Sequence, residues 1–175
     1  MAVKLEVKRL RDDVKLPRFA HTGDMCFDIP VLIDKGDYAP FLLDGDIQEH
    51  TPLVVHTDKN GDKYVVIEPQ QAVVFHTGLK CATNYGYGLK VHVRSSIGIK
   101  KKLILSNATG IIDTAQYRGE LLISLTNTGV SPRRIINQER VGQGEVVKVE
   151  DVVIVEVDTL SKTERGEGGI GSTGV

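Results

Sequence analysis

The segment 165–175 contains residues suited to holding an anion: five glycines, the hydroxyls of Ser172 and Thr173, and the guanidinium of Arg165. Glycines let successive backbone N–H groups turn toward one anion, hydroxyls donate further hydrogen bonds, and a planar guanidinium matches phosphate oxygens. A Gly/Ser-rich segment is also typical of a flexible linker, so this segment alone leaves both interpretations open.

Four segments upstream carry polar residues that fit the same kind of ligand. They are 23–29 with Asp28, then Arg94-Ser95-Ser96, then 107–119 with Asn107, Asp113 and Tyr117-Arg118-Gly119, then 139–143 with Gln143. In this order, and with 165–175 as the fifth, they resemble the five motifs of the trimeric dUTPase (deoxyuridine triphosphate nucleotidohydrolase) family. The resemblance runs from near the N-terminus to the last residue and leaves out mainly 38–64.

This resemblance implies a Mg²⁺-dependent dUTP diphosphatase, which hydrolyses dUTP to dUMP and pyrophosphate and keeps uracil out of DNA. It also implies a homotrimer with sites shared between subunits, in which 161–175 is a mobile phosphate-binding arm that crosses to a neighbour. The arm would supply six substrate-binding residues: Arg165, Gly169, Ile170, Gly171, Ser172 and Thr173.

The phosphates set the first chemical requirement. A nucleoside triphosphate carries about four negative charges, so its site needs guanidinium groups, hydroxyls and amides from several loops, usually with Mg²⁺. Arg94, Ser95 and Ser96 fit as substrate-binding residues, and Gln143 fits beside them and counts with the catalytic residues. Arg140 stays open, because it fits a structural ion pair as well as a phosphate contact.

Two carboxylates complete the implied chemistry. Asp113 matches the family's catalytic acid, which would orient and deprotonate a water that attacks the α-phosphorus. Asp28 matches the acid that reaches the metal through water. Because the sequence has no dense acidic cluster, we expect most Mg²⁺ ligands to come from the triphosphate and from water.

The nucleoside part has its own residues. The family's uracil-reading hairpin corresponds to Asn107 and to the backbone of Gly110, Ile111 and Ile112. Tyr117 matches the aromatic ring under the deoxyribose, where it would leave no room for a ribose 2′-hydroxyl.

Three features depart from the family pattern. Ile170 replaces a phenylalanine that covers the base, and Phe75, Tyr85 or Tyr87 could take its place. One additional residue separates Asp113 from Tyr117, which predicts a bulge or a wider turn. After Gln143, the pair Gly144-Glu145 interrupts an apolar stretch and leaves the strand register open.

The elements that must position these residues are strands. Alternating apolar residues predict strands at 3–7, 89–93, 121–125 and, in a Val-rich run, 152–157; only 97–106 fits a short helix. Many short strands with Gly, Asn and Asp turns favour an all-β barrel or jelly roll.

Residues 38–64 are polar and rich in turn residues. Asn60-Gly61 lies between the apolar residues of 54–55 and 64–67, which predicts the tip of a β-hairpin. The stretch is too short to bury a core of its own, so we predict a surface insert within a single domain of residues 1–160.

Composition restricts the partners. The 175 residues carry a net charge of −1 with both signs interspersed, which argues against a broad surface for nucleic acid. No secretory segment or membrane-length apolar run is visible, so we expect a cytoplasmic protein of a cell or a virus-infected host. Cys26 and Cys81 are predicted to be buried and inert, and five dispersed histidines argue against a zinc site.

Three other interpretations compete. The related dCTP deaminase family shares the Arg-Ser-Ser segment, but this chain has Ser124 where that family has its catalytic glutamate. A dUTP-binding regulatory protein acting through 38–64 is compatible with the enzyme. A purely structural trimer does not explain the recurring polar residues.

Overall fold

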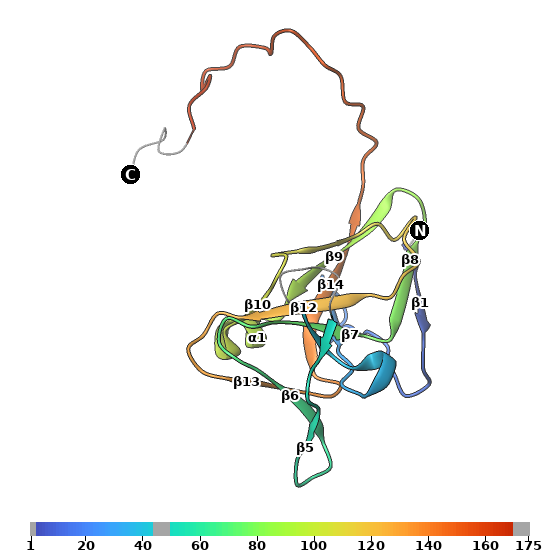
Figure 1. The fold of residues 1–175 in the computed structure, drawn as a ribbon. Coiled ribbons are helices and arrows are strands. Elements are labelled where there is room, and N and C mark those ends of the chain that lie inside the picture. Colours follow the sequence, from blue (N-terminus) through green and yellow to red (C-terminus); the bar gives the residue numbers. More distant parts are fainter. Residues whose placement is uncertain (1–2, 44–49, 170–175) are drawn as a thin grey trace.

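Two antiparallel sheets, one of five strands and one of four, form most of the fold (Figure 1). The computed structural model describes residues 3–43 and 50–169. The five-stranded sheet has the order β10 (Leu103–Leu105), β12 (Leu122–Asn127), β7 (Ala72–His76), β3 (Phe41–Leu43) and β4 (His50–Pro52). The all-β prediction is therefore confirmed.

The four-stranded sheet carries most of the predicted polar motifs. Its order is β11 (Gly110–Ile112), β9 (Tyr87–Val93), β14 (Arg140–Lys148) and β2 (Phe27–Pro30). Each neighbouring pair is antiparallel, and β14 lies between β9 and β2 over much of its length. Motifs separated by more than a hundred residues are thereby brought into one sheet.

Two smaller sheets complete the described chain. One pairs β1 (Leu5–Arg9) with β8 (Leu79–Thr83); the other has the order β13 (Arg133–Ile136), β6 (Lys63–Ile67) and β5 (His56–Thr57). A short 3-10 helix covers Gly36–Tyr38. The hairpin of β5 and β6 turns at Asn60-Gly61 as predicted, with Gly61 at φ +86° and the Asp58 carboxylate accepting from two backbone N–H groups of the turn.

Aliphatic side chains fill the interior, as expected for a chain without tryptophan. Ile29, Phe75, Leu103, Ile123 and Leu125 are almost completely buried, and they come from strands of both large sheets. Strand β9 shows how the alternating pattern acts, because Leu89 and Val91 face the core while Lys90 is exposed. The sheets thus pack through the faces that the alternation predicted.

The helix prediction was wrong in its extent. Helix α1 covers Ser95–Lys101, and Lys102 then takes a left-handed conformation with φ +57°. The backbone N–H of Lys102 donates to the carbonyl of Ile97. This hydrogen bond ends the helix, and the chain then enters β10. Within the described residues, no helix has the length and apolar character needed to cross a bilayer.

The strand predicted at 152–157 was also wrong for this chain. The segment is extended but pairs with no strand in the described part of the chain, and Val153 and Ile154 are 84% and 93% exposed. It belongs to a stretch that leaves β14 and runs away from the barrel (Figure 1). A strand needs a partner for its backbone N–H and C=O groups, and the barrel of the same chain does not supply one.

The predicted insert is only partly a surface feature. Strand β3 pairs with β7 in the large sheet, so Phe41 and Leu42 lie beside Val73 and Val74. The hairpin of β5 and β6 projects from the barrel (Figure 1). Residues 44–49, within the predicted insert, lie outside the described residues.

Candidate active site

The first hollow lies where β9 passes into α1. Arg94 joins the two elements in an extended conformation, and its backbone N–H donates to the carbonyl of Val141 on β14 at 3.0 Å. A hollow of about 500 Å³ opens there, lined by Ala20, Asp24, Met25, Cys26, Asp28, Arg94, Ser95, Ser96 and Gln143. The structure therefore brings Asp28 together with Arg94, Ser95, Ser96 and Gln143, four of the residues predicted to hold phosphates, whereas Arg165 does not line this hollow.

Asp28 is held by two guanidinium groups. Nε of Arg94 lies 2.6 Å from Oδ1 of Asp28, and Nη1 of Arg140 donates to Oδ2 at 2.8 Å. Nη1 of Arg94 also donates to the backbone carbonyl of Arg140 at 3.1 Å. Asp28 is 8% exposed, so the clamp fixes the Arg94 guanidinium at the wall of the hollow, which Arg140 does not line.

Sheet register explains why Gln143 belongs to this hollow. Gln143 pairs with Asp28 on β2 and with His92 on β9, so its side chain lies on the same face as that of Asp28. The interruption at Gly144 does not disturb the register, because β14 continues to Lys148. A Cβ at Gly144 would lie 2.5 Å from the ring of Phe27, so the glycine leaves space for that ring.

Three polar groups of the hollow are available to a ligand. The hydroxyls of Ser95 and Ser96 and the side-chain amide of Gln143 make no hydrogen bond within residues 3–43 and 50–169. Together with Arg94 they present hydroxyl, amide and guanidinium donors to one space. Such a set suits phosphate oxygens.

A second hollow, of about 240 Å³, lies beside β11, the edge strand of the four-stranded sheet. It is lined by Ile111, Ile112, Asp113, Tyr117, Glu120 and Leu122. Asp113 follows β11 directly, and its exposed carboxylate makes no hydrogen bond within the described part of the chain. A carboxylate in this position is free to accept a proton from water.

The turn after Asp113 absorbs the additional residue. The carbonyl of Asp113 accepts hydrogen bonds from the N–H groups of Gln116, at 2.8 Å, and Tyr117, at 2.7 Å, which closes one helical turn. Arg118 donates to the carbonyls of Thr114 and Ala115. This is the wider turn that the spacing predicted, and Arg118 stabilises it instead of facing a ligand.

Tyr117 is positioned by its neighbours. Its hydroxyl donates to the carbonyl of Glu120 at 3.1 Å, and its ring lies against Gly119, where a Cβ would overlap the hydroxyl end of the ring. The glycine of the Tyr-Arg-Gly triplet is therefore required by the ring. The ring remains 46% exposed at the wall of the second hollow.

The predicted base-reading residues are only partly gathered. Ile111 and Ile112 line the second hollow, whereas Asn107 lies in the exposed turn before β11 and Gly110 at the strand's start, and neither lines it. Gly110 pairs with Val91, and a Cβ there would come within 3.1 Å of Val91 Cβ. A side chain at Gly110 would therefore press on β9.

The arm shows no contact with either hollow within the residues that the structure describes. Arg165 is exposed, and its Nε donates to the carbonyl of Gly168 at 2.8 Å, within the arm itself. Gly169 is also exposed, while Ile170, Gly171, Ser172 and Thr173 lie outside the described residues. Phe75 is fully buried in the core and so is not the missing cover for the base.

The cysteines behave differently from each other. Cys81 is buried as predicted, and burial raises the pKa of its thiol to about 11. Cys26 is only half-buried and lines the first hollow, so the prediction of a buried residue was wrong there. Burial, then the charges of Glu145 and Asp24, raise the pKa of the Cys26 thiol, which keeps it protonated and unreactive at neutral pH.

Sequence reasoning missed Glu120, which lines the second hollow. Its carboxylate accepts from the N–H of Gly78 at 2.7 Å and lies 2.9 Å from Nδ1 of His76, while its carbonyl holds Tyr117. Its place directly after Tyr-Arg-Gly was the only signal. The charge of Glu120 itself gave no indication of these partners.

No lining residue is shared by the two hollows in the described part of the chain. Arg94, Ser95, Ser96 and Gln143 belong to one, and Asp113 and Tyr117 to the other. A water held by Asp113 and a phosphate held by Arg94 of the same chain are therefore not in one space. Either a second copy joins them, or the chemistry uses only one hollow.

The family model described as dUTPase matches residues 58–174. The chain belongs to the dUTPase family. The deoxyuridine 5′-triphosphate nucleotidohydrolase of Thermobifida fusca (strain YX) is 33% identical over 173 residues, which cover 98% of this chain and 79% of that protein. This settles the family against the dCTP deaminase alternative.

Solved dUTPases have the same fold. The Staphylococcus bacteriophage 80alpha dUTPase, solved with dUPNHPP, has a TM-score of 0.72 at 25% identity and covers 98% of this chain and 99% of its own. A mutant dUTPase of phage phi11 of S. aureus, described with a structural Mg(II) ion, has a TM-score of 0.66 at 19% identity over 91% of this chain and 99% of its own. The jelly-roll prediction is thereby confirmed.

Proposed function

We propose that this protein hydrolyses dUTP to dUMP and pyrophosphate. The observation that carries the proposal is the first hollow, where the fixed guanidinium of Arg94 lies with the unpaired donors of Ser95, Ser96 and Gln143. The choice of dUTP as the substrate follows from membership of the dUTPase family. The reaction belongs to nucleotide metabolism, and we place it in the cytoplasm.

In the proposed reaction, Asp113 takes a proton from a water whose oxygen attacks the α-phosphorus. A bond forms between that oxygen and the α-phosphorus, and the bond from the α-phosphorus to the bridging oxygen breaks, so pyrophosphate leaves with that oxygen. Arg94, Ser95, Ser96 and Gln143 stabilise the charge that develops on the phosphate oxygens. Arg94 is preorganised by the Asp28 clamp and Gln143 by its place in the sheet, before substrate arrives.

Ile111, Ile112 and Tyr117 form the proposed nucleoside site. The backbone of edge strand β11 would read the uracil through main-chain groups, with Asn107 in the turn that leads into it and Gly110 at its first position. The Tyr117 ring, fixed by Gly119 and the carbonyl of Glu120, would stack on the deoxyribose and exclude a 2′-hydroxyl.

Magnesium is the proposed metal, and the residues present fit an ion that arrives with the substrate. Both oxygens of Asp28 are already bound to arginines, and no group of three or more His, Cys, Asp or Glu residues able to hold a metal occurs in the described part of the chain. Asp24 and Asp28 line the hollow and would bind the ion's water ligands. When bound, Mg²⁺ would neutralise phosphate charge and polarise the α-phosphorus.

We further propose a homotrimer with shared sites. Two observations support it: the two hollows are separate in one chain, and the Val-rich segment 152–157 leaves its apolar side chains exposed without a strand partner among the described residues. A neighbouring copy could cover that segment and bring the Asp113 of one chain to the Arg94 of another. The arm 161–175, with Arg165, Gly169 and the residues beyond it, would then close over the phosphates.

The regulatory alternative stays a prediction for 38–64, whose projecting part is the hairpin of β5 and β6. Arg134 lies over the Tyr64 ring with its guanidinium carbon 3.9 Å from the ring centroid, and its Nη2 lies 2.5 Å from an oxygen of Asp58. These contacts hold the hairpin against β13, and none of its described residues lines either hollow. A protein bound there would therefore leave the hollows themselves accessible.

The test is pyrophosphate release from dUTP, dTTP, dCTP and UTP with Mg²⁺, measured on the full chain. The proposal predicts rapid release from dUTP alone. Equal release from UTP would contradict the role of Tyr117, and no release from any nucleotide would contradict the enzyme and leave the regulatory alternative.

A further inference from the structure

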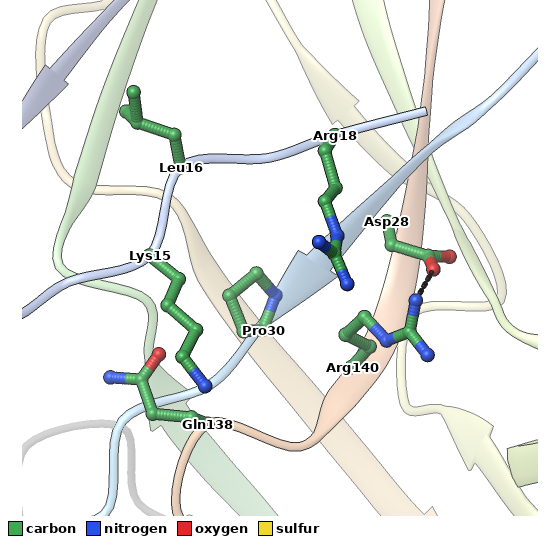
Figure 2. Close-up of a pocket in the computed structure, with 7 residues that line it drawn as sticks. All are labelled: Lys15, Leu16, Arg18, Asp28, Pro30, Gln138 and Arg140. Atoms are coloured by element: carbon green, nitrogen blue, oxygen red, sulfur yellow. Dashed lines mark hydrogen bonds and ion pairs between the residues drawn. The ribbon is translucent and has the colours of Figure 1, made fainter. Parts of the chain in front are cut away.

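A third hollow, of about 380 Å³, lies on the other side of the Asp28 clamp and has no role in the proposed reaction (Figure 2). Three cationic side chains line it: Lys15, Arg18 and Arg140. Among the described residues, the one carboxylate in its wall is Asp28, whose charge is already shared between Arg140 and Arg94. The hollow therefore has an excess of positive charge.

Two of these cations have no partner of their own. The Lys15 ammonium and the Arg18 guanidinium make no hydrogen bond or ion pair within residues 3–43 and 50–169. Arg18 forms an antiparallel bridge with Asp28, whose N–H donates to its carbonyl at 2.9 Å, so both side chains lie on one face. Figure 2 shows Arg18 directed toward Asp28 and Arg140, with Lys15 across Pro30 from them.

Gln138 adds an independent observation. Its side-chain Oε1 is buried without a hydrogen-bond partner in the described chain, and its backbone has φ +63°, a conformation that favours glycine. The turn is fixed, because the N–H of Gln138 donates to the carbonyl of Val31 at 2.9 Å. A strained residue that also buries an unpaired amide costs stability, and such a combination is typical of a binding site.

The chemistry of these groups selects the ligand. Two guanidinium groups and one ammonium around a single paired carboxylate suit a small anion with several charges, and guanidinium groups bind phosphate oxygens in pairs. A flip of the Gln138 side-chain amide, which exchanges its oxygen and nitrogen, would direct the N–H donors to the same anion.

We propose that this hollow binds inorganic pyrophosphate or phosphate. The anion would lie against Arg18 and Arg140 and so share Arg140 with Asp28. The identification of the anion as the product of the reaction rests on the proposed function. The excess of positive charge in the hollow does not depend on that function.

The test is titration of pyrophosphate into the full chain without Mg²⁺ at low ionic strength, followed by calorimetry. The double variant Lys15→Met/Arg18→Gln should lose at least about tenfold in affinity at one of two pyrophosphate sites. The matched control Lys8→Met/Lys59→Met also removes two positive charges, at exposed positions that line none of the three hollows, and should titrate as the wild type does. Identical titrations of wild type and Lys15→Met/Arg18→Gln would overturn the proposal.

A second double variant distinguishes this site from the substrate site. Ser95→Ala/Ser96→Ala should weaken the other pyrophosphate site only, and its failure to do so would count against the proposed function and not against this hollow. If Lys15→Met/Arg18→Gln changes the oligomeric mass in light scattering while leaving pyrophosphate binding intact, the hollow is an interface between copies and the proposal is overturned.

Crystals of the wild-type chain soaked in pyrophosphate test the site without any variant. Density for the anion between Arg18 and Arg140 would support it. Density only beside Ser95 and Ser96 would overturn it.

Discussion

Arg94 reaches the first hollow with its Nε bound 2.6 Å from Oδ1 of Asp28, so a carboxylate that is almost buried fixes the cation offered to the phosphates. Arg140 holds the other oxygen at 2.8 Å. Asp28 thus acts in this chain first as the residue that orients two arginines. Any water-mediated contact to a metal comes in addition to that role.

The variant Asp28→Asn should therefore lose both stability and substrate affinity. Removing the carboxylate leaves two guanidinium groups facing each other, with an expected cost of about 3 kcal/mol in the free energy of unfolding. Urea unfolding measures this, with Asp24→Asn as the control, since Asp24 lines the same hollow but is exposed. Equal stability losses in the two variants would contradict the clamp.

Gly119→Ala should disturb sugar selection without unfolding the barrel. A Cβ there overlaps the hydroxyl end of the Tyr117 ring, so the ring must leave its position. We expect the ratio of kcat/KM for dUTP over UTP to fall at least about tenfold, equivalent to about 1.4 kcal/mol. The matched control is Gly88→Ala, whose Cβ meets its nearest atom at an ordinary 3.5 Å; an unchanged ratio in Gly119→Ala would show that Tyr117 does not select the sugar.

The strands were largely predictable, because alternation in 89–93 and 121–125 reports directly which side chains face the core. The run 152–157 has the same apolar character but no partner in the described part of its own chain, and a sequence does not say which chain supplies a partner. The helix end was hidden for a different reason: Lys102 takes a left-handed conformation that a glycine would have signalled.

The site was predictable in chemistry but not in arrangement. Residue types at Arg94, Ser95, Ser96 and Gln143 indicated phosphate donors, and the structure gathers them. The partner of Arg140 is 112 residues away, so the choice between an ion pair and a phosphate contact required the sheet register. Glu120 holds Tyr117 through its backbone carbonyl and contacts His76 through its carboxylate, and no motif in the sequence indicates either contact.

Cys81 makes stability depend on pH in the alkaline range. Burial raises the pKa of its thiol to about 11, whereas the pKa of the thiol in the unfolded chain is about 8.5. Its stabilising contribution is therefore complete below pH about 8 and is lost as the pH rises toward about 11.

Comparison of wild type with Cys81→Val isolates this contribution. At pH about 10.5 the wild type should have lost about 2 kcal/mol more of its free energy of unfolding than Cys81→Val, relative to pH about 8. Urea unfolding at both pH values measures the difference. The same decline in both proteins would show that this thiol is not held protonated by the fold.

Deletion of residues 165–175 should remove activity and leave the barrel intact. Arg165 bonds only within the arm in the described chain, so the melting temperature should change by less than about 2 °C. We expect kcat/KM for dUTP to fall at least about a hundredfold, as expected when a donor to developing charge is lost. Differential scanning calorimetry and steady-state kinetics are the measurements, and a large drop in melting temperature would make the arm structural.

In the proposed reaction, Asp113 activates water while separate groups hold the phosphates. Pyrophosphate release and dUTP binding, measured side by side on the wild type and on Asp113→Asn, test it most directly. We predict that Asp113→Asn releases pyrophosphate at least about a thousandfold more slowly and still binds dUTP nearly as tightly, because only the base is removed. Equal losses in affinity and rate, or undiminished release, would contradict this account.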